Sequence, residues 1–212
     1  AIHRAGLQSL FPPRAGTPRA STMSKDKKDE KDSMGKLEEL FLKSRTIMLY
    51  GEINQKVARE FCTKLQLLAS ESDDDITVYI NSPGGHVESG DSIHDMIRFV
   101  KPRVKVVGTG WVASAGALIY AAPPVEDRFS LPNTRYMLHQ PSGGVGGQAS
   151  DISIEADQIV KMRERLNQIF ADQTGQPIET IAKDTDRNFW MTPEEAKEYG
   201  LVGKIIQSKD EL

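Results

Sequence analysis

The sequence predicts an α/β domain built from βαβ units. Short runs rich in β-branched residues alternate with longer segments whose apolar residues recur at helical spacing, in the order strand, helix, strand, helix, strand, helix. Successive strands joined by helices favour parallel pairing within one sheet. The chain has 212 residues, of which 38% are hydrophobic, and this is enough for one good-sized domain or two small ones.

The first half of the chain supplies three strands and three helices. Helical spacing predicts helices, whereas short apolar or alternating runs predict strands. The expected elements, in order, are a first helix over 37–42, a strand over 46–50, a helix over 55–70, a strand over 76–80, a helix over 87–100 and a strand over 104–107.

The second half is dominated by one long helix over 149–174, which ends at Gly175. At about 1.5 Å per residue it would span about 39 Å, more than a compact domain of this size needs. We therefore expect part of it to project and to meet another subunit. The other expected elements are helix 115–122, strands 129–131 and 136–139, helix 178–183, a helix from 192–193 and a final strand over 202–206.

The composition excludes several classes of protein. The formal net charge of −3 does not fit a nucleic-acid binder, and no apolar run approaches the roughly 18 residues of a membrane span. Cys62 is the single cysteine, so no internal disulfide can form, and a reducing compartment such as the cytoplasm fits. Cys62 lies among apolar residues and is interpreted as a small core residue.

Both ends of the chain are expected to lie outside the folded domain, which we place at 36–207. Residues 1–35 begin with a basic, acid-free stretch and continue into a run of Lys, Asp and Glu, so we expect disorder. A transit peptide or a start at Met23 fits the same region. Residues 208–212 end in Lys-Asp-Glu-Leu, the letters of an endoplasmic reticulum retention signal. With no apolar signal region near the N-terminus, they are interpreted as a charged tail.

Ser114 is the candidate nucleophile because it lies at a turn between a strand and a helix. At such a turn the hydroxyl of Ser114 lies at the positive end of the helix dipole. The small residues on either side of Ser114 would let a substrate backbone come close to this nucleophile. An ordinary helix N-cap is the alternative interpretation. The segment 81–85, Asn-Ser-Pro-Gly-Gly, also follows a strand and precedes a helix, so its amides can face a developing negative charge. A phosphate-binding loop is disfavoured there because the Lys-Ser/Thr ending is missing.

His139 is the candidate general base because it ends an apolar strand in the same α/β unit as Ser114. Of the other histidines, His3 lies in the N-terminal segment. His86 and His94 are expected to be solvated on a polar helix face. A histidine at a strand end is usually structural, so the case for His139 depends on its combination with Ser114.

The glycine-rich segment 140–148 has two open interpretations. Its glycines leave unencumbered backbone groups, which fits either a flexible loop or an edge segment that pairs with an extended peptide by β-augmentation.

Five linked motifs resemble ClpP, the proteolytic subunit of the ATP-dependent Clp proteases, over about 37–206. They occur in that family's order and spacing: Ile-Asn-Ser-Pro-Gly-Gly at 80–85, Gly-Trp-Val-Ala-Ser-Ala-Gly at 110–116, Met-Leu-His-Gln-Pro at 137–141, Gly-Gln-Ala at 147–149 and Asp-Thr-Asp-Arg at 184–187.

The resemblance implies a ClpP/crotonase-type fold with the long helix as a projecting handle. It implies Ser114 as nucleophile, His139 as base, and the amides of Gly85 and Ala115 as oxyanion donors. The implied peptide-holding strand comprises Ser142, Gly143, Gly144, Val145 and Gly146, and the implied ring–ring contact is Asp186 with Arg187.

The resemblance also implies an assembly and partners. Family members form two stacked heptameric rings around a proteolytic chamber, and hexameric AAA+ Clp unfoldases deliver protein and peptide substrates. ATP would be bound by that partner, and neither a cofactor nor a metal is expected in this chain.

Three features depart from the family pattern. The third catalytic position, usually Asp, is Asn188, which suggests a weaker or conditionally active triad. The axial-loop region before the first helix is the Lys/Asp run and Met34-Gly35. Trp111 and Val112 in the nucleophile turn, and Ala115 after Ser114, stand where smaller or Met residues are frequent in the family. The bulkier Trp111 either reshapes the substrate pocket or simply packs.

Three functions therefore compete. The first is a serine endopeptidase subunit. The second is a weakly active or inactive structural subunit of a mixed ring, activated by a ClpP paralogue, and Asn188 keeps this alternative open. The third is an acyl-CoA enzyme of the crotonase type, which the combination of Ser114 and His139 disfavours.

Overall fold

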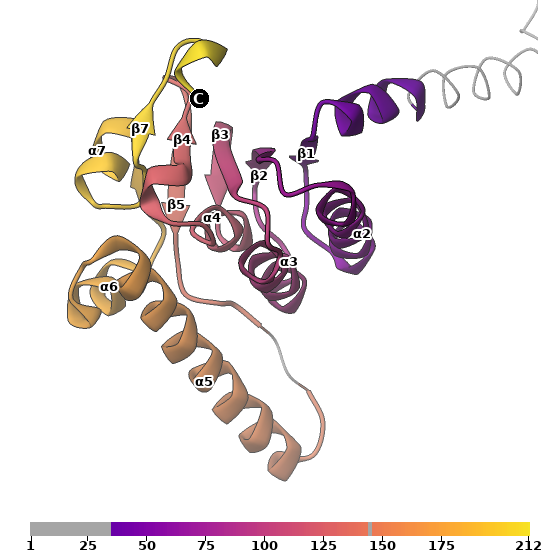
Figure 1. Cartoon of the computed structure of the whole chain (residues 1–212). Helices are drawn as coiled ribbons and strands as arrows, with labels where there is room; N and C mark the ends of the chain where they lie inside the picture. Colours follow the sequence, from indigo (N-terminus) through magenta and orange to yellow (C-terminus); the bar gives the residue numbers. More distant parts are fainter. Residues whose placement is uncertain (1–34, 144–145) are drawn as a thin grey trace, which may run out of the picture. The chain divides into compact units, whose positions relative to one another are not determined.

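The computed structural model describes residues 35–143 and 146–212 (Figure 1). The chain divides into two units, Ala1–Leu40 and Phe41–Leu212. The described part of the first unit, residues 35–40, is helical, and the helical assignment continues to residue 43. The expectations for residues 1–34 lie outside the described residues. Everything below concerns the second unit.

The second unit contains one sheet in which almost every strand pair is parallel, as the sequence predicted. Its path runs β1-β2-β3-β4-β7, while β5 pairs with β3 and also with β6. Among the strands that the described residues form, β5 and β6 make the one antiparallel pair. The strands are β1 (Thr46–Tyr50), β2 (Ile76–Ser82), β3 (Val104–Ala113), β4 (Arg128–Ser130), β5 (Arg135–Leu138), β6 (Phe189–Met191) and β7 (Lys204–Ile205).

The long strand β3 changes partner halfway along its length. Residues 106–108 pair with β4, whereas residues 111–113 pair with β5. The change occurs around Gly110, whose φ of 65° favours glycine and where a Cβ would lie 2.6 Å from the Asn81 amide nitrogen. The end of β3 is thereby joined to β5 and β6, and this arm of the sheet carries the candidate site.

Three helices lie side by side on one face of the sheet: α2 (Gln55–Glu71), α3 (Val87–Phe99) and α4 (Ala115–Tyr120) (Figure 1). The N-terminus of α2 is capped by Asn54, whose side chain accepts from the Val57 amide at 3.0 Å. The helices and the sheet enclose one apolar core, which includes Phe61, Leu65, Ile80, Ile93, Val106, Leu118, Ile119 and Leu138. Cys62 is half-buried against this core, and burial raises the pKa of its thiol.

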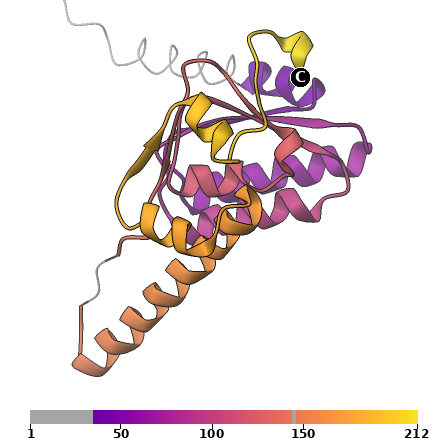
Figure 2. The ribbon, with the colours of Figure 1, turned by 90° about the vertical axis from the view of Figure 1, so that its left-hand side faces the viewer.

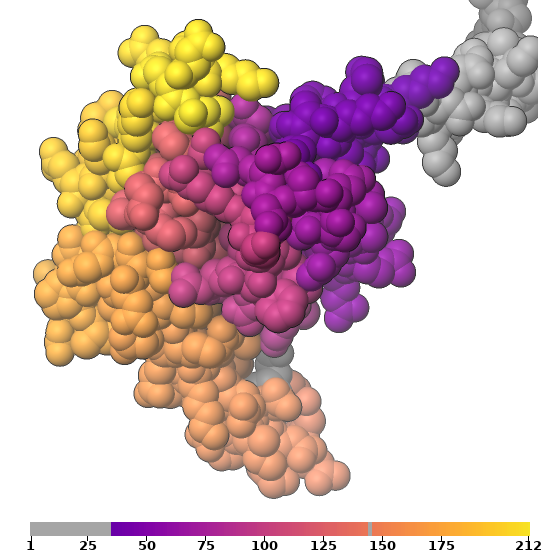
Figure 3. All heavy atoms as spheres, viewed as in Figure 1, coloured from indigo at the N-terminus to yellow at the C-terminus, as the bar shows by residue number. Residues whose placement is uncertain are grey.

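The helix α5 (Ala149–Thr174) projects from the rest of the unit (Figures 2 and 3). Its C-terminal part is anchored by the buried residues Leu166, Asn167, Phe170 and Ala171, while residues 149–158 are exposed. Gly175, at φ 75°, ends the helix in the left-handed conformation. The predicted projection is confirmed, whereas contact with another subunit stays a prediction.

The C-terminal elements differ from expectation in two places. The strand expected over 202–206 is shorter and comprises only Lys204–Ile205. Val202 does not join it, because its amide donates to the carbonyl of Ala196 at the end of α7 (Pro193–Glu198). The strand β6 was missed altogether. The helix α6 is Ile178–Asp184, and short 3-10 turns form at Val125–Asp127 and Lys209–Glu211.

The end of the chain is ordered by its own contacts. Glu211 accepts from the amides of Gln207 and Ser208 at 2.8 and 2.9 Å, and Leu212 packs against the small apolar cluster of Val107, Phe129 and Ile206. Within residues 35–143 and 146–212, no helix combines the length and apolar character needed to cross a membrane.

Candidate active site

Ser114 lies between the end of β3 and the start of α4 in a strained backbone conformation. Its φ of 55° and ψ of −124° are rare for a residue with a side chain, and such strain concentrates at functional sites. The Ser114 amide donates to the Met137 carbonyl at 2.9 Å, which ties the turn to β5. The Ser114 side chain forms no helix-capping hydrogen bond, so its hydroxyl is directed to another partner.

That partner is His139, at the end of β5. Ser114 Oγ lies 2.7 Å from His139 Nε2, and His139 Nδ1 lies 3.0 Å from Asn188 Oδ1. Because an amide oxygen only accepts, this arrangement places the imidazole proton on Nδ1 and leaves Nε2 to accept the serine proton. The three side chains thus form a relay from hydroxyl to imidazole to amide.

Asn188 reaches this position through β6. In the antiparallel pair, Leu138 lies opposite Phe189, so the residues just beyond, His139 and Asn188, are neighbours. The Gln140 amide also donates to the Thr185 carbonyl at 2.6 Å. The apolar run Phe-Trp-Met after Asn188 was the available signal for this strand.

The loop 82–86 lies against the nucleophile turn. Ser82 Oγ accepts from the Gly84 amide at 3.1 Å, and a Cβ on Gly84 would lie 2.6 Å from Ser114 Cβ. The sequence interpretation missed this role of Gly84, although the Gly-Gly pair signals a close backbone approach.

Gly85 is held by a single β-bridge to Ile53. The Ile53 amide donates to the Gly84 carbonyl, and the Ile53 carbonyl accepts from the His86 amide, both at 2.8 Å. In such a bridge the central residue's own amide points away from its partner. Ala115 is the first residue of α4, where helical amides have no intrahelical acceptor. Both proposed donor amides thus lie on backbone that borders the nucleophile turn.

The glycine-rich segment follows His139, and its Gly143 lies beside α5. Ser142 and Gly143 are exposed and belong to no assigned strand, and the same holds for Gly146. Gly144 and Val145 lie outside the described residues. A Cβ on Gly143 would lie 3.3 Å from Ile159 Cδ1, so the segment borders the long helix.

An open hollow of about 540 Å³ lies beside the relay. It is lined by His139, Gln140, Pro141, Ser142, Asp186, Arg187 and Asn188. The Asp186 carbonyl accepts from Gln140 Nε2 at 2.8 Å, and the Asp186 carboxylate lies 3.4 Å from Arg163 and 3.8 Å from Arg187. The Arg187 side chain is 92% exposed, which leaves it open to a partner.

The expectation that His94 is solvated is wrong. Its relative exposure is 5%, because α3 turns it toward the interior, and burial lowers its pKa although Asp95 accepts from Nδ1 at 3.0 Å. His86 is exposed, as expected, and it also caps α3, with Nδ1 2.9 Å from Ser89 Oγ. Among residues 35–143 and 146–212, no cluster of three or more His, Cys, Asp or Glu side chains is arranged to hold a metal ion.

Comparison with known proteins identifies the family. The sequence model described as Clp protease matches residues 28–209. The "ATP-dependent Clp protease proteolytic subunit 3" of Rhizobium etli is 59% identical over 194 residues, which cover 90% of this chain and 100% of that protein. The "ATP-dependent Clp protease proteolytic subunit 2" of Pseudomonas aeruginosa is 54% identical, covering 90% and 98%.

Solved structures agree with the sequence relatives. ClpP1 from Listeria monocytogenes superposes with a TM-score of 0.76 at 57% identity, covering 83% of this chain and 99% of that one. An asparagine-to-aspartate mutant of the same protein gives a TM-score of 0.77, covering 82% and 98%. These matches span nearly the whole of each relative, so the chain belongs to the Clp protease family, whose proteolytic subunits are serine-type peptidases.

Proposed function

We propose that this chain is a serine endopeptidase subunit that cleaves peptides and unfolded proteins delivered by an ATP-dependent unfoldase. The observation that carries the proposal is the 2.7 Å approach of Ser114 Oγ to His139 Nε2, on a turn whose backbone is strained. A hydroxyl is a weak nucleophile alone and is activated when an adjacent base takes its proton.

In this reaction Ser114 Oγ attacks the scissile carbonyl carbon while its proton passes to His139 Nε2. The tetrahedral intermediate then collapses, the C–N bond breaks, and His139 gives the proton to the leaving amine. Water, activated by the same imidazole, hydrolyses the acyl-enzyme and releases Ser114. Each proton that His139 takes up is returned within the cycle, so no cofactor is consumed.

The amides of Gly85 and Ala115 would stabilise the oxyanion of the tetrahedral intermediate. Ala115 directly follows the nucleophile, and the loop that carries Gly85 is fixed by Ile53. Donors fixed in place before the reaction are worth about 3 to 4 kcal/mol each in serine proteases. Gly84 packs closely against the nucleophile turn, which supports a position of both donors near the hydroxyl.

Asn188 would orient the imidazole through its amide oxygen. Unlike a carboxylate it carries no charge, so it cannot offset the imidazolium charge that forms during attack. We therefore propose a triad that is competent but slower than one with aspartate, with a tautomer set by the orientation of the amide.

The assembly proposed is two stacked heptameric rings served by a hexameric AAA+ Clp unfoldase. Family membership supports ring assembly and an unfoldase partner in general. Three apolar side chains on the projecting helix, Ile152, Ile154 and Val160, are 39%, 57% and 54% exposed, which fits a helix that packs against another subunit. Asp186 and Arg187 are proposed to pair across the rings, and the segment 142–146 to hold the substrate peptide.

A second candidate is a weakly active or inactive structural subunit of a mixed ring, activated by a ClpP paralogue. The single observation in its favour is Asn188, whose exposed amide is held only by His139 among the described residues. A partner that holds this amide with its oxygen on His139 Nδ1 would keep the relay in its active arrangement.

Labelling of the purified full-length chain with a fluorophosphonate probe separates these candidates. Labelling of the parent that is lost in Ser114→Ala would establish an activated serine in the chain by itself. The exposed Ser70→Ala on α2 serves as a matched control and should label like the parent. An unlabelled parent that becomes labelled after mixing with a paralogue would support the structural-subunit candidate instead.

A further inference from the structure

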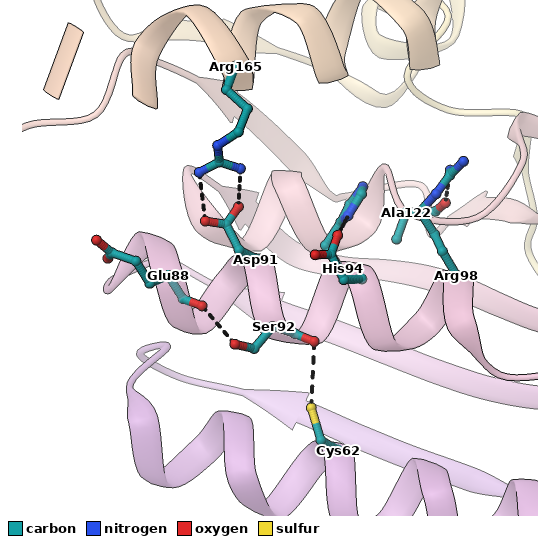
Figure 4. A network of polar contacts seen from close by, with 9 residues as sticks. Cys62, Glu88, Asp91, Ser92, His94, Arg98, Ala122 and Arg165 are labelled. Carbon is teal, nitrogen blue, oxygen red and sulfur yellow. Dashed lines mark hydrogen bonds and ion pairs between the residues drawn. The ribbon is translucent and has the colours of Figure 1, made fainter. Parts of the chain in front are cut away.

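Asp91 on α3 and Arg165 on α5 form a two-pronged ion pair (Figure 4). Arg165 Nη1 donates to Asp91 Oδ1 and Nη2 donates to Oδ2, both at 2.7 Å. Paired, parallel hydrogen bonds of this kind fix an orientation as well as a distance. The Asp91 carboxylate, by accepting them, raises the pKa of Arg165.

The pair joins α3 and α5. Each of these helices follows directly, in the sequence, one of the two segments that are proposed to contact the substrate. The helix α3 starts two residues after Gly85, and a Cβ on Gly90 would lie 3.1 Å from Ala115 Cβ, so α3 packs beside both proposed oxyanion donors. The helix α5 follows the glycine-rich segment, which borders it where Gly143 meets Ile159. Asp91 and Arg165 therefore connect the oxyanion side to the peptide-holding side.

Arg165 lies where α5 leaves the rest of the unit. The buried stretch begins at Leu166, and its far end is fixed by the buried Arg128, which donates to the Gln173 carbonyl at 2.9 Å. The projecting part, 149–164, is about 24 Å long, so a tilt of about 5° at its base would move its far end by about 2 Å. A shift of that size is larger than the width of the range, about 2.7–3.2 Å, within which hydrogen bonds form, so it would weaken the contacts between the segment and an extended peptide.

The helix is held from two sides at this point. On one side, Arg163 lies 3.4 Å from the carboxylate of Asp186, which belongs to the loop that carries Asn188. Arg165 follows two residues later, about 200° further around the helix, and projects toward α3. The other acidic side chains near Arg165, Asp95 and Glu88, also lie on α3. The contact with Asp186 limits movement in one direction, and the contact with Asp91 limits it in the other.

We propose that Asp91 and Arg165 are positioning residues that set the spacing between Ser142 and Gly143, the described start of the peptide-holding segment, and the oxyanion loop, and so determine the affinity for extended peptides. The inference rests on the proposed function. Ser114 and His139 are carried by β3 and β5, not by α5, so loss of the pair affects substrate binding and leaves the reactivity of the serine intact.

The test uses the full-length assembled protein with Asp91→Asn and Arg165→Met, of which the second keeps an apolar stem. For a fluorogenic peptide of about eight residues we expect KM to rise about five- to tenfold, with kcat within about twofold of the parent. Turnover of a two-residue fluorogenic substrate and fluorophosphonate labelling of Ser114 should not change. Lys56→Met, which removes the exposed Lys56–Glu60 pair on α2, is the matched control.

Exchange of the two charges, Asp91→Arg with Arg165→Asp, should return the KM for the long peptide to within about twofold of the parent. The inference would be overturned if the single variants assemble and keep the parental KM for the long peptide. It would also be overturned if the exchange variant assembles but its KM for the long peptide stays raised. If the single variants do not assemble, the exchange variant decides alone. An unlabelled parent Ser114 is a different result, because it refutes the proposed function itself.

Discussion

Asn188 meets His139 through its amide oxygen, 3.0 Å from Nδ1, and this is the only side-chain hydrogen bond of Asn188 within residues 35–143 and 146–212. An amide has a donor end and an acceptor end. Rotation by half a turn would present NH₂ to Nδ1 and move the imidazole proton to Nε2, where it blocks transfer from Ser114. The relay therefore has one productive and one unproductive amide orientation.

Replacement Asn188→Asp should increase turnover, because a carboxylate accepts in both orientations and stabilises the imidazolium. We expect kcat to rise at least about tenfold, with an upper bound of about 10⁴, and KM to stay the same. Steady-state hydrolysis of a fluorogenic peptide measures this, with Asn188→Ala as the low-activity control. An unchanged or lower rate in the Asp variant would show that the amide is already well oriented.

Substitution Gly84→Ala should abolish most activity without loss of the fold. A Cβ there would lie 2.6 Å from Ser114 Cβ and 2.8 Å from the Ala113 carbonyl oxygen, so the nucleophile turn or the oxyanion loop must shift. Loss of one oxyanion donor alone costs about 10² to 10³ in kcat. Gly51→Ala is the matched control, since Gly51 also has positive φ but open space around it. Comparable activity in the two variants would contradict the proposed packing.

Removal of the Arg187 side chain tests the proposed ring–ring contact. Within the chain, Arg187 is 92% exposed and 3.8 Å from Asp186, and an exposed pair of this kind contributes less than about 1 kcal/mol to folding. Arg187→Ala should therefore fold normally but sediment as single rings, while Lys56→Ala sediments as double rings. Intact double rings in the Arg187 variant would show that Arg187 is not needed for ring–ring assembly.

Burial of His94 predicts a pH dependence of stability. Desolvation lowers its pKa in the folded state below the usual 6.5, more than the hydrogen bond to Asp95 raises it. As pH falls below 6.5 the unfolded chain takes up a proton that the folded chain does not, so the free energy of unfolding falls. This loss should be reduced in His94→Gln, which does not titrate. Urea unfolding at pH 7.5 and 5.5 measures it, and equal losses in both proteins would refute the prediction.

Local sequence patterns predicted most of the secondary structure and the chemical parts of the site. Alternation and helical spacing placed most of the major elements to within a few residues, because amphipathic periods are set by near neighbours. An exception is β3, which was expected over 104–107 and extends over Val104–Ala113. The turn at Ser114 and the strand end at His139 were also visible, since each depends on the residues directly around it. That the two residues act together was an inference from their place in one α/β unit, and in the structure Ser114 Oγ lies 2.7 Å from His139 Nε2.

The sequence alone determined the identity and order of the reactive groups, the parallel β-sheet and the long helix. Tertiary structure decided how distant segments meet: β6 brings Asn188 to His139 across 49 residues, and Arg165 reaches Asp91 across 74. It also decided that His94 is buried, although Asp91, Ser92 and Asp95 lie close to it in the sequence. Local periodicity indicates which face of an element is apolar. Which element it packs against, and how deeply a given side chain is buried, depend on how all elements pack together into one core.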